Sequence, residues 1–347
     1  MNPLFGVFLH ALGGFAAGSF YVPLKQVKGW SWESGWLVAG FFSWIVVPLV
    51  AALIIVSDLG AVLRAAPASS LGWAFVLGML WGVGGLTFGL TMRYLGVSLG
   101  YAVALGMTTT FGTLIPPIYS GQFVELVTQN AGLVTLLGIG VTLLGIAATG
   151  RAGMLKDREQ SEAQKREQIR EFNFAKGVWV ALFSGVMSAC MAFAIASGKP
   201  IAEAAVAHGT PALWQNTPVF VVILAGGFLT NALWCLFLNA KNRSFRDYAN
   251  VRGGGIRNYG FAALAGTTWY LQFLFYGMGT TQMGRYDFAS WSIHMAFIIL
   301  FSTMWGLATH EWSGASSRAR RALYFGLGLL VISVLVIGLG NYLAQPN

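Results

Sequence analysis

The sequence predicts an all-α integral membrane protein of ten transmembrane helices, arranged as two inverted five-helix repeats. Composition is the first reason: 56% of the 347 residues are hydrophobic, 10% are charged and the mean hydropathy is +0.65. A soluble domain carries about a quarter charged residues. This composition therefore excludes an ordinary soluble enzyme, a soluble nucleic-acid-binding protein and a disordered chain.

Ten apolar stretches are the second reason, because a spanning helix needs about 20 apolar residues. The alternation of about ten residues that is typical of barrel strands is absent from the sequence. No basic segment precedes the first stretch, so we expect it to be a spanning helix and not a cleaved signal peptide. The stretches are residues 4–25, 35–57, 71–93, 98–120, 132–150, 175–197, 216–239, 258–281, 286–309 and 322–344.

One long charged segment, Lys156–Glu171, divides the chain and is the third reason. We expect a first repeat at 1–150, a linker at 151–173 that includes a short cytoplasmic helix, and a second repeat at 174–347. Five stretches in each half make the halves enter the membrane in opposite directions. Secondary transporters use this geometry and place their substrate at the interface between the repeats.

Two tryptophans add weak internal similarity. Trp81 precedes Gly89 by eight residues in the third stretch, and Trp269 precedes Gly277 by eight in the eighth. The third and eighth stretches are equivalent under a five-helix repeat. The pattern therefore favours the repeat.

The basic residues predict the orientation. The loops that follow the odd-numbered stretches hold 18 of the 21 Lys and Arg residues, and the other loops hold only Arg64, Lys199 and Arg285. Basic residues stay on the cytoplasmic side. We therefore expect a multi-pass protein of a bacterial inner membrane with both termini outside the cytoplasm. The net charge of +9 indicates contact with anionic lipid, and no nucleic acid is expected.

Several Trp-rich motifs resemble the L-rhamnose–proton symporter family, within the drug/metabolite transporter superfamily. The resemblance implies the ten-helix fold of that superfamily and uptake of L-rhamnose or a related 6-deoxy sugar with a proton by alternating access. The third stretch departs from the family pattern, with Gly85, Thr87 and Phe88 in place of Asn and Tyr. The motifs are Phe20–Lys25 (FYVPLK), Val27–Glu33 (VKGWSWE), Gly89–Gly96 (GLTMRYLG), Arg151–Gly153 (RAG), Trp269–Phe273 (WYLQF) and Tyr286–Met295 (YDFASWSIHM).

Other functions receive less support. The sequence contains no phosphate-binding loop, no HExxH zinc motif and no GxSxG nucleophile motif, so we expect no enzyme, no cofactor, no metal and no ATPase partner. Cys190 and Cys235 fall inside apolar stretches and are expected to be reduced core residues. The main alternative is an exporter or exchanger of another small metabolite on the same scaffold.

Three ionisable residues are candidates for proton coupling, because such groups are costly inside a membrane. Asp287, with Trp291 at i+4 and His294 at i+7, forms one face of the ninth stretch. Asp287 could instead pair with Arg285. His294 titrates closest to neutral pH, and a packing role is an equal alternative.

Glu33 is the third candidate and lies at the start of the second stretch. It could bind the proton or the sugar, with Lys25 and Lys28 as partners. The alternative is that the carboxylate stabilises the helix dipole and that the two lysines reach the headgroups.

Gln272 leads the candidates for sugar binding, because its amide both donates and accepts, as a vicinal diol requires. Aromatic rings can cover the apolar face of a sugar, and lipid contact or core packing is the alternative for each of them. The full set of predicted substrate-binding residues is Gln272, Trp269, Tyr270, Trp291, Ser290, His294, Trp81, Tyr101, Tyr21 and His10.

Glycine pairs spaced by four residues predict close helix contacts. They are Gly14 and Gly18, Gly78 and Gly82, and Gly85 and Gly89.

Overall fold

The computed structural model describes residues 1–95, 97–159, 173–249 and 255–345, and within these ranges it contains helices and turns but no strand. Eight helical segments are long and apolar enough to cross a membrane. Helices α7 (Val97–Tyr119) and α14 (Ile256–Thr280) have 23 and 25 residues but are not among these eight. The prediction of an all-α, multi-pass membrane protein is confirmed, and the count of ten spans stays a prediction.

The first two spanning segments of the chain are each interrupted once. Helix α1 gives way to α2 after Ser19, and a π-helical turn interrupts the second segment where Trp44 lies. Such turns are frequent at functional sites. The elements are α1 (Pro3–Ser19), α2 (Tyr21–Leu24), α3 (Trp32–Phe41), η1 (Phe42–Val46), α4 (Val47–Ile55), α5 (Leu59–Ala65), α6 (Ala68–Leu95), α7, α8 (Phe123–Thr128) and α9 (Asn130–Arg158).

The second half begins where the side chain of Asn173 caps α11 by accepting a hydrogen bond from the Lys176 N–H. Pro218 occupies the first turn of α13, where its missing N–H costs nothing. The elements are α11 (Phe174–Ser197), α12 (Lys199–Ala207), η2 (Ala212–Trp214), α13 (Thr217–Asn242), η3 (Ser244–Ala249), α14, η5 (Gly284–Ala289), α15 (Ser290–Ala308) and α16 (Ser317–Leu343).

Several helix ends differ from their predicted positions. Helix α9 continues to Arg158, past the predicted end at 150, so residues 151–153 lie inside the helix. The predicted short helix at Lys156–Glu171 falls mostly outside the described residues. Helix α15 begins at Ser290 and not at 286, because the backbone is kinked at Tyr286, where φ is −104° and ψ is 44°.

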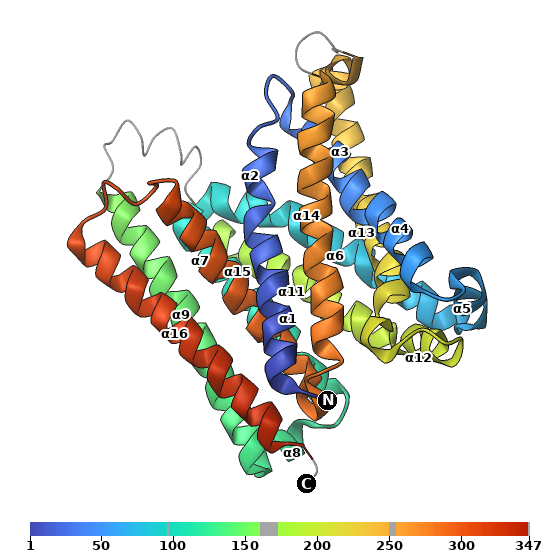
Figure 1. Ribbon diagram of the computed structural model, residues 1–347. Helices are drawn as coiled ribbons and strands as arrows, with labels where there is room; N and C mark the ends of the chain where they lie inside the picture. Colours follow the sequence, from blue (N-terminus) through green and yellow to red (C-terminus); the bar gives the residue numbers. More distant parts are fainter. Residues whose placement is uncertain (96, 160–172, 250–254, 346–347) are drawn as a thin grey trace.

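The helices pack in reciprocal pairs around the centre of the molecule. Helix α1 contacts α14 and α15, and α11 contacts α6 and α7. Helices α9 and α16 pack along each other at one edge, and both chain ends lie at the same end of the bundle (Figure 1). The turn that follows α2 lies at the opposite end (Figure 1).

Two of the three glycine pairs form the expected close contacts. A Cβ on Gly78 would lie 2.1 Å from the Ile223 carbonyl oxygen, and one on Gly14 would lie 2.3 Å from Phe297 Cβ. Gly85 and Gly89 instead face open space, with no atom within 4 Å of an added Cβ. The prediction of a helix contact at Gly85 and Gly89 is therefore wrong, because this face of α6 lines a cavity.

The main hydrophobic cluster joins both halves of the chain around Trp44, Phe220 and Phe273. Cys190 and Cys235 are buried and free, as the sequence predicts. A second cluster packs α15 against α9 and α16. Together the clusters hold a ring of helices around one central space.

Candidate functional site

A central cavity of about 1380 Å³ lies between the two halves of the chain. Helices α1, α2, α3, α6, α7, α11, α13, α14 and α15 and the turn η1 all contribute to its wall. It opens past exposed Lys25, Gln26 and Glu311, and its inner end stops at buried Tyr276 and Trp291. The cavity is thus open to one end of the bundle and closed toward the end that carries the termini.

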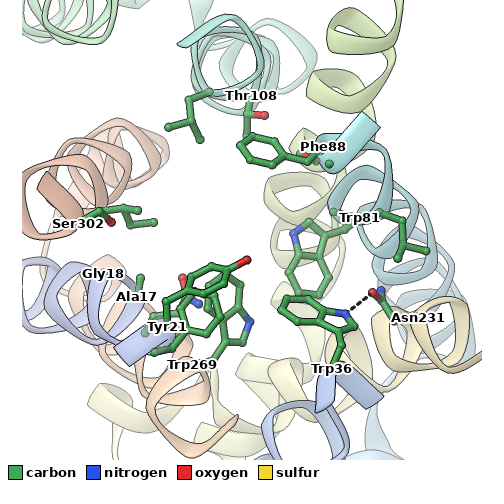
Figure 2. A pocket seen from close by; sticks show the side chains of 18 of the residues that line it. Ala17, Gly18, Tyr21, Trp36, Trp81, Phe88, Thr108, Asn231, Trp269 and Ser302 are labelled. Carbon is green, nitrogen blue, oxygen red and sulfur yellow. Dashed lines mark hydrogen bonds between the residues drawn. The ribbon is translucent and has the colours of Figure 1, made fainter. Parts of the chain in front are cut away.

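Aromatic side chains form one wall of this cavity. The Trp44 ring lies 5.9 Å from Trp81 and 6.0 Å from Trp36, centroid to centroid, and Trp81 lies 5.6 Å from Phe273. Trp269 packs edge-on against Phe20 at 4.2 Å. Figure 2 shows Trp36, Trp81 and Trp269 around the open space. Such a wall offers flat apolar surface to a ligand.

Asn231 of α13 fixes the orientation of this wall. Its Oδ1 accepts a hydrogen bond from Trp36 Nε1 at 3.1 Å, drawn in Figure 2. Its Nδ2 donates to the carbonyl oxygens of Gly82 and Gly227 at 3.3 and 3.0 Å. The amide is therefore fully used in holding α3, α6 and α13 together.

Polar atoms gather at the inner end of the cavity, in a group that we name the cavity-floor cluster: Gln272, Tyr276, Trp291 and His294. Gln272 Oε1 lies 3.3 Å from His294 Nε2, and Trp291 Nε1 donates to the Thr108 carbonyl oxygen at 3.2 Å. Gln272 Nε2 and His294 Nδ1 are buried and have no hydrogen-bond partner. Since unpaired buried polar atoms are costly, their presence beside a cavity indicates a ligand site.

Most of the predicted substrate-binding residues line this cavity. They include both members of the Gln272–His294 contact and four of the predicted aromatic residues. The lining residues among the predictions are Gln272, Trp269, Trp291, His294, Trp81 and Tyr21.

Three predicted residues that the structure describes do not line it. Tyr270 is 1% exposed within the main hydrophobic cluster, on the far face of α14 from Gln272. Ser290 is buried at the start of α15, and His10 is fully buried beyond the cavity floor. The side chain of Tyr101 lies outside the described residues. The assignment of Tyr270, Ser290 and His10 to the cavity wall is therefore not supported by the geometry.

Asp287 lies away from the cavity, on the exposed turn η5 at the end that carries the termini. The kink at Tyr286 removes it from the helical face that holds Trp291 and His294. It does not pair with Arg285, because Arg285 donates to Glu125 of α8.

Glu33 is buried at the start of α3 but does not line the cavity. Its Oε1 accepts hydrogen bonds from Asn242 Nδ2 at 2.9 Å and from Ser244 Oγ at 2.7 Å. Of the two predicted lysine partners, Lys25 has its side chain engaged elsewhere. Lys25 Nζ lies 3.2 Å from Glu311 Oε1 at the cavity mouth, and the Lys28 backbone N–H donates to Asn258 Oδ1.

Sequence reasoning missed Trp36, Trp44 and Thr108 as lining residues. Trp32, Trp36 and Trp44 recur at spacings of four and eight in the second stretch, and this pattern could have indicated a single helix face. Thr108 carries no such signal, because it stands among three consecutive threonines. The three residues that depart from the family pattern, Gly85, Thr87 and Phe88, all lie on the cavity wall.

Comparison with known proteins identifies the family. The model of the family described as "L-rhamnose-proton symport protein (RhaT)" matches residues 2–343 of this chain. The chain belongs to this family. An L-rhamnose-proton symporter of Klebsiella pneumoniae is 39% identical over 339 residues, which cover 96% of this chain and 97% of the relative. One of Salmonella paratyphi B is 40% identical over the same shares. Members of the L-rhamnose-proton symport protein family are transporters and not enzymes.

Proposed function

We propose that this chain takes up L-rhamnose, or a related 6-deoxy sugar, together with a proton across the bacterial inner membrane. The observation that carries the proposal is the family match over nearly the whole chain, combined with a cavity that is open at one end and closed at the other. The relatives named above are L-rhamnose-proton symporters, and this chain aligns with almost their entire length. A one-ended cavity is what a carrier that works by alternating access requires.

The cavity suits a 6-deoxy sugar. Trp81 and Trp269 offer ring faces for the C–H face of a pyranose and apolar surface for its methyl group. Gln272 and His294 line the cavity and carry the nitrogens that could bond its hydroxyl groups. A site that binds hydroxyl groups by such partners rejects analogues that lack them.

The proposal includes ten spans in two inverted five-helix repeats, divided at residues 151–173, and membership of the drug/metabolite transporter superfamily. Packing supports the repeat. If each spanning helix is replaced by the one five places away in chain order, the α1–α14 contact becomes the α11–α6 contact. The same shift exchanges the α1–α15 contact with the α11–α7 contact and leaves the α9–α16 pair unchanged. Trp81 and Trp269, equivalent under this shift, both line the cavity.

We infer that both termini are outside the cytoplasm, because 18 of 21 basic residues lie in loops at the other end. The cavity mouth, with Lys25 and Glu311, would then face the cytoplasm. An engineered cysteine tests this. Gly89 lines the cavity with open space around it, so Gly89→Cys with Cys190→Ser and Cys235→Ala should react with an impermeant maleimide only from the cytoplasmic side. Reaction only from outside would overturn the orientation.

The sequence offers Asp287, Glu33 and His294 as candidates for proton coupling, and their placements rank them. Only His294 touches the cavity, Glu33 has its oxygen occupied by two donors, and Asp287 lies at the outer end. His294 is therefore the strongest of the three. Asp287→Asn and Glu33→Gln should both leave concentrative uptake largely intact.

Uptake by proteoliposomes tests the function. One proton moving down about 150 mV supplies about 3.5 kcal/mol, which accumulates the sugar a few hundredfold. We expect radiolabelled L-rhamnose to accumulate when a pH gradient or membrane potential is applied, and the outer medium to become alkaline as sugar enters. Uptake without any proton movement would reject symport. Absence of L-rhamnose transport, with another metabolite competing for binding, would favour the exporter or exchanger alternative.

A further inference from the structure

Two of the four histidines in the chain lie close together inside the membrane-spanning bundle. His10 of α1 is 0% exposed and His294 of α15 is 2% exposed, and their ring centroids are 6.3 Å apart. His208 and His310, by contrast, are exposed at helix ends. The buried pair, His10 and His294, joins the two halves of the chain at the cavity floor.

The nitrogens of this pair are largely unpaired. Both ring nitrogens of His10 and Nδ1 of His294 are buried without a hydrogen-bond partner, and only His294 Nε2 has one, Gln272 Oε1 at 3.3 Å. A neutral imidazole always carries one lone pair that accepts a proton. Two neutral imidazoles in one buried place therefore offer two lone pairs, either of which can accept a proton.

The surrounding backbone is shaped to admit both rings. A Cβ on Gly279 would lie 2.7 Å from His10 Cε1, and one on Gly13 would lie 3.2 Å from His294 Cε1. Tyr276 packs its ring against both imidazoles, at 5.2 Å from His10 and 5.1 Å from His294. The absence of a side chain at Gly13 of α1 and Gly279 of α14 thus leaves room for the two imidazole rings.

Few charges face this pocket. Asp287 of η5 acts electrostatically on Tyr276, and Lys199 acts on Asp287. Helix α7 contains no Asp, Glu, Lys or Arg, and those of α9 and α16 lie near the helix ends at 151–158 and 318–321. A proton on the pair would therefore be the main positive charge at this depth, with the Asp287 carboxylate as its distant counter-charge.

We propose that His10 and His294 together hold the transported proton, as one two-imidazole site that the cavity reaches only through His294. This inference rests on the proposed function for the identity of the sugar, but not for the existence of the site. A proton from outside forms an N–H bond at one imidazole lone pair, and the site gains one positive charge. On the cytoplasmic side the same N–H bond breaks and the proton passes to water, so no electrons change hands.

The pair also explains how sugar and proton are linked. His294 Nε2 and Gln272 Oε1 share one contact, and both residues line the cavity. A charged His294 is a stronger donor to a sugar hydroxyl than a neutral one. Sugar in the cavity therefore favours the protonated pair, and loss of the proton weakens sugar binding.

A first experiment uses the chain without any sugar. Full-length protein in lipid nanodiscs, labelled with ¹⁵N in its histidine rings, carries His208→Gln and His310→Asn so that only the buried pair gives signals. Coupled groups titrate as a pair with midpoints separated by more than about one pH unit. We expect both rings to respond in each step, and His10→Gln to shift the midpoint of His294 by about one pH unit or more. Two independent titrations, or no titration of either ring between about pH 4 and 9, would overturn the shared site.

A second experiment separates coupling from sugar movement. In proteoliposomes His10→Gln and His294→Gln should accumulate L-rhamnose at least about tenfold less than wild type under a pH gradient, while His10→Gln keeps exchange of labelled for unlabelled sugar. His208→Gln, whose ring lies on an exposed helix end, is the matched control. Full accumulation by His10→Gln would overturn the pair and leave the proposed function standing. Wild-type protein that neither accumulates nor exchanges L-rhamnose would instead overturn the proposed function, and the NMR titration would still decide the site.

Discussion

Two buried polar clusters in this molecule differ in whether their atoms have partners. The cavity-floor cluster, with His10 beneath it, contains four buried nitrogens without a hydrogen bond. The second group, which we name the α3–α13 polar cluster, consists of Glu33, Ser34, Asn239, Asn242, Ser244 and Asp247. It contains no unpaired buried atom among the described residues.

The α3–α13 polar cluster is a closed network. Ser34 Oγ lies 3.0 Å from Asn239 Oδ1 and 2.9 Å from Asp247 Oδ2, and these two acceptors share its single proton. Ser244 Oγ lies 2.9 Å from Asn239 Oδ1, and Asn239 Nδ2 donates to Tyr248 Oη at 3.1 Å. A satisfied network stabilises one arrangement of helices, whereas an unsatisfied one keeps atoms available for a ligand. The comparison therefore separates a structural cluster from a functional one, although both are buried and polar.

The largest effect on uptake is expected in the cavity-floor cluster. Gln272→Leu should lower L-rhamnose uptake about 100-fold, because two hydrogen bonds of about 1 to 1.5 kcal/mol each are lost. The free energy of unfolding should fall by only about 1 kcal/mol, since the Oε1 contact with His294 Nε2 is lost while Gln272 Nε2 has no hydrogen-bond partner. Uptake is measured on protein whose melting temperature has been determined in the same detergent. A large loss of stability with transport retained would show that the residue is structural.

The reverse pattern is expected for Glu33→Ala. Asn242 Nδ2 would lose its acceptor and Ser244 Oγ would keep only Asn239 Oδ1, at a cost of about 1 to 3 kcal/mol. The melting temperature should fall by several degrees, while uptake per folded molecule stays within about twofold. Glu33→Gln, which keeps one acceptor oxygen, is the matched control and should cost less. If uptake disappeared in both variants while they stayed folded, the cluster would belong to the coupling machinery.

The aromatic wall should show an intermediate effect on binding. Trp81→Leu removes a ring that packs against Trp44 and Phe273 beside the cavity. We expect the Kd for L-rhamnose to rise about three- to tenfold, in line with the value of an aromatic contact. Trp179→Leu, at a position that is 71% exposed on α11, should leave Kd unchanged. Isothermal titration of the two variants would decide, and equal affinities would move the sugar away from this wall.

The ion pair at the cavity mouth should matter least. Lys25 and Glu311 are 64% and 49% exposed, and such pairs contribute about 0 to 1 kcal/mol. Lys25→Gln should change the initial uptake rate less than about threefold, and added salt should reduce the difference further. A tenfold effect that persists in high salt would instead make the pair part of a gate.

The sequence carried enough information to find the spanning helices, because apolar runs of this length have few other uses. It also pointed to Gln272, Trp269, Trp291 and His294, which line the cavity, since polar groups inside a membrane are rare and tryptophan offers a flat ring to a sugar. It could not give the rotation of each helix, because these helices are apolar nearly all round. Trp36 and Trp44 were missed for that reason, and Tyr270 was placed on the wrong face of α14.

Local backbone irregularities account for the remaining errors. The i, i+4, i+7 pattern that grouped Asp287 with Trp291 and His294 assumes an unbroken helix, and the kink at Tyr286 breaks it. Glu33 looked like a possible coupling group because its partners Asn242 and Ser244 are more than 200 residues away in the chain. Neither the kink at Tyr286 nor the distant partners of Glu33 can be recognised from the sequence alone.

The most direct test of the account is the proton flux that L-rhamnose induces in proteoliposomes, measured with an internal pH-sensitive dye. Wild type and Glu33→Gln should both show proton entry when sugar is added outside, and Gln272→Leu should show almost none. The same three proteins should be equally folded by near-ultraviolet circular dichroism. Equal proton flux in Gln272→Leu and wild type, or flux lost only in Glu33→Gln, would contradict the assignment of the cavity-floor cluster as the site of transport.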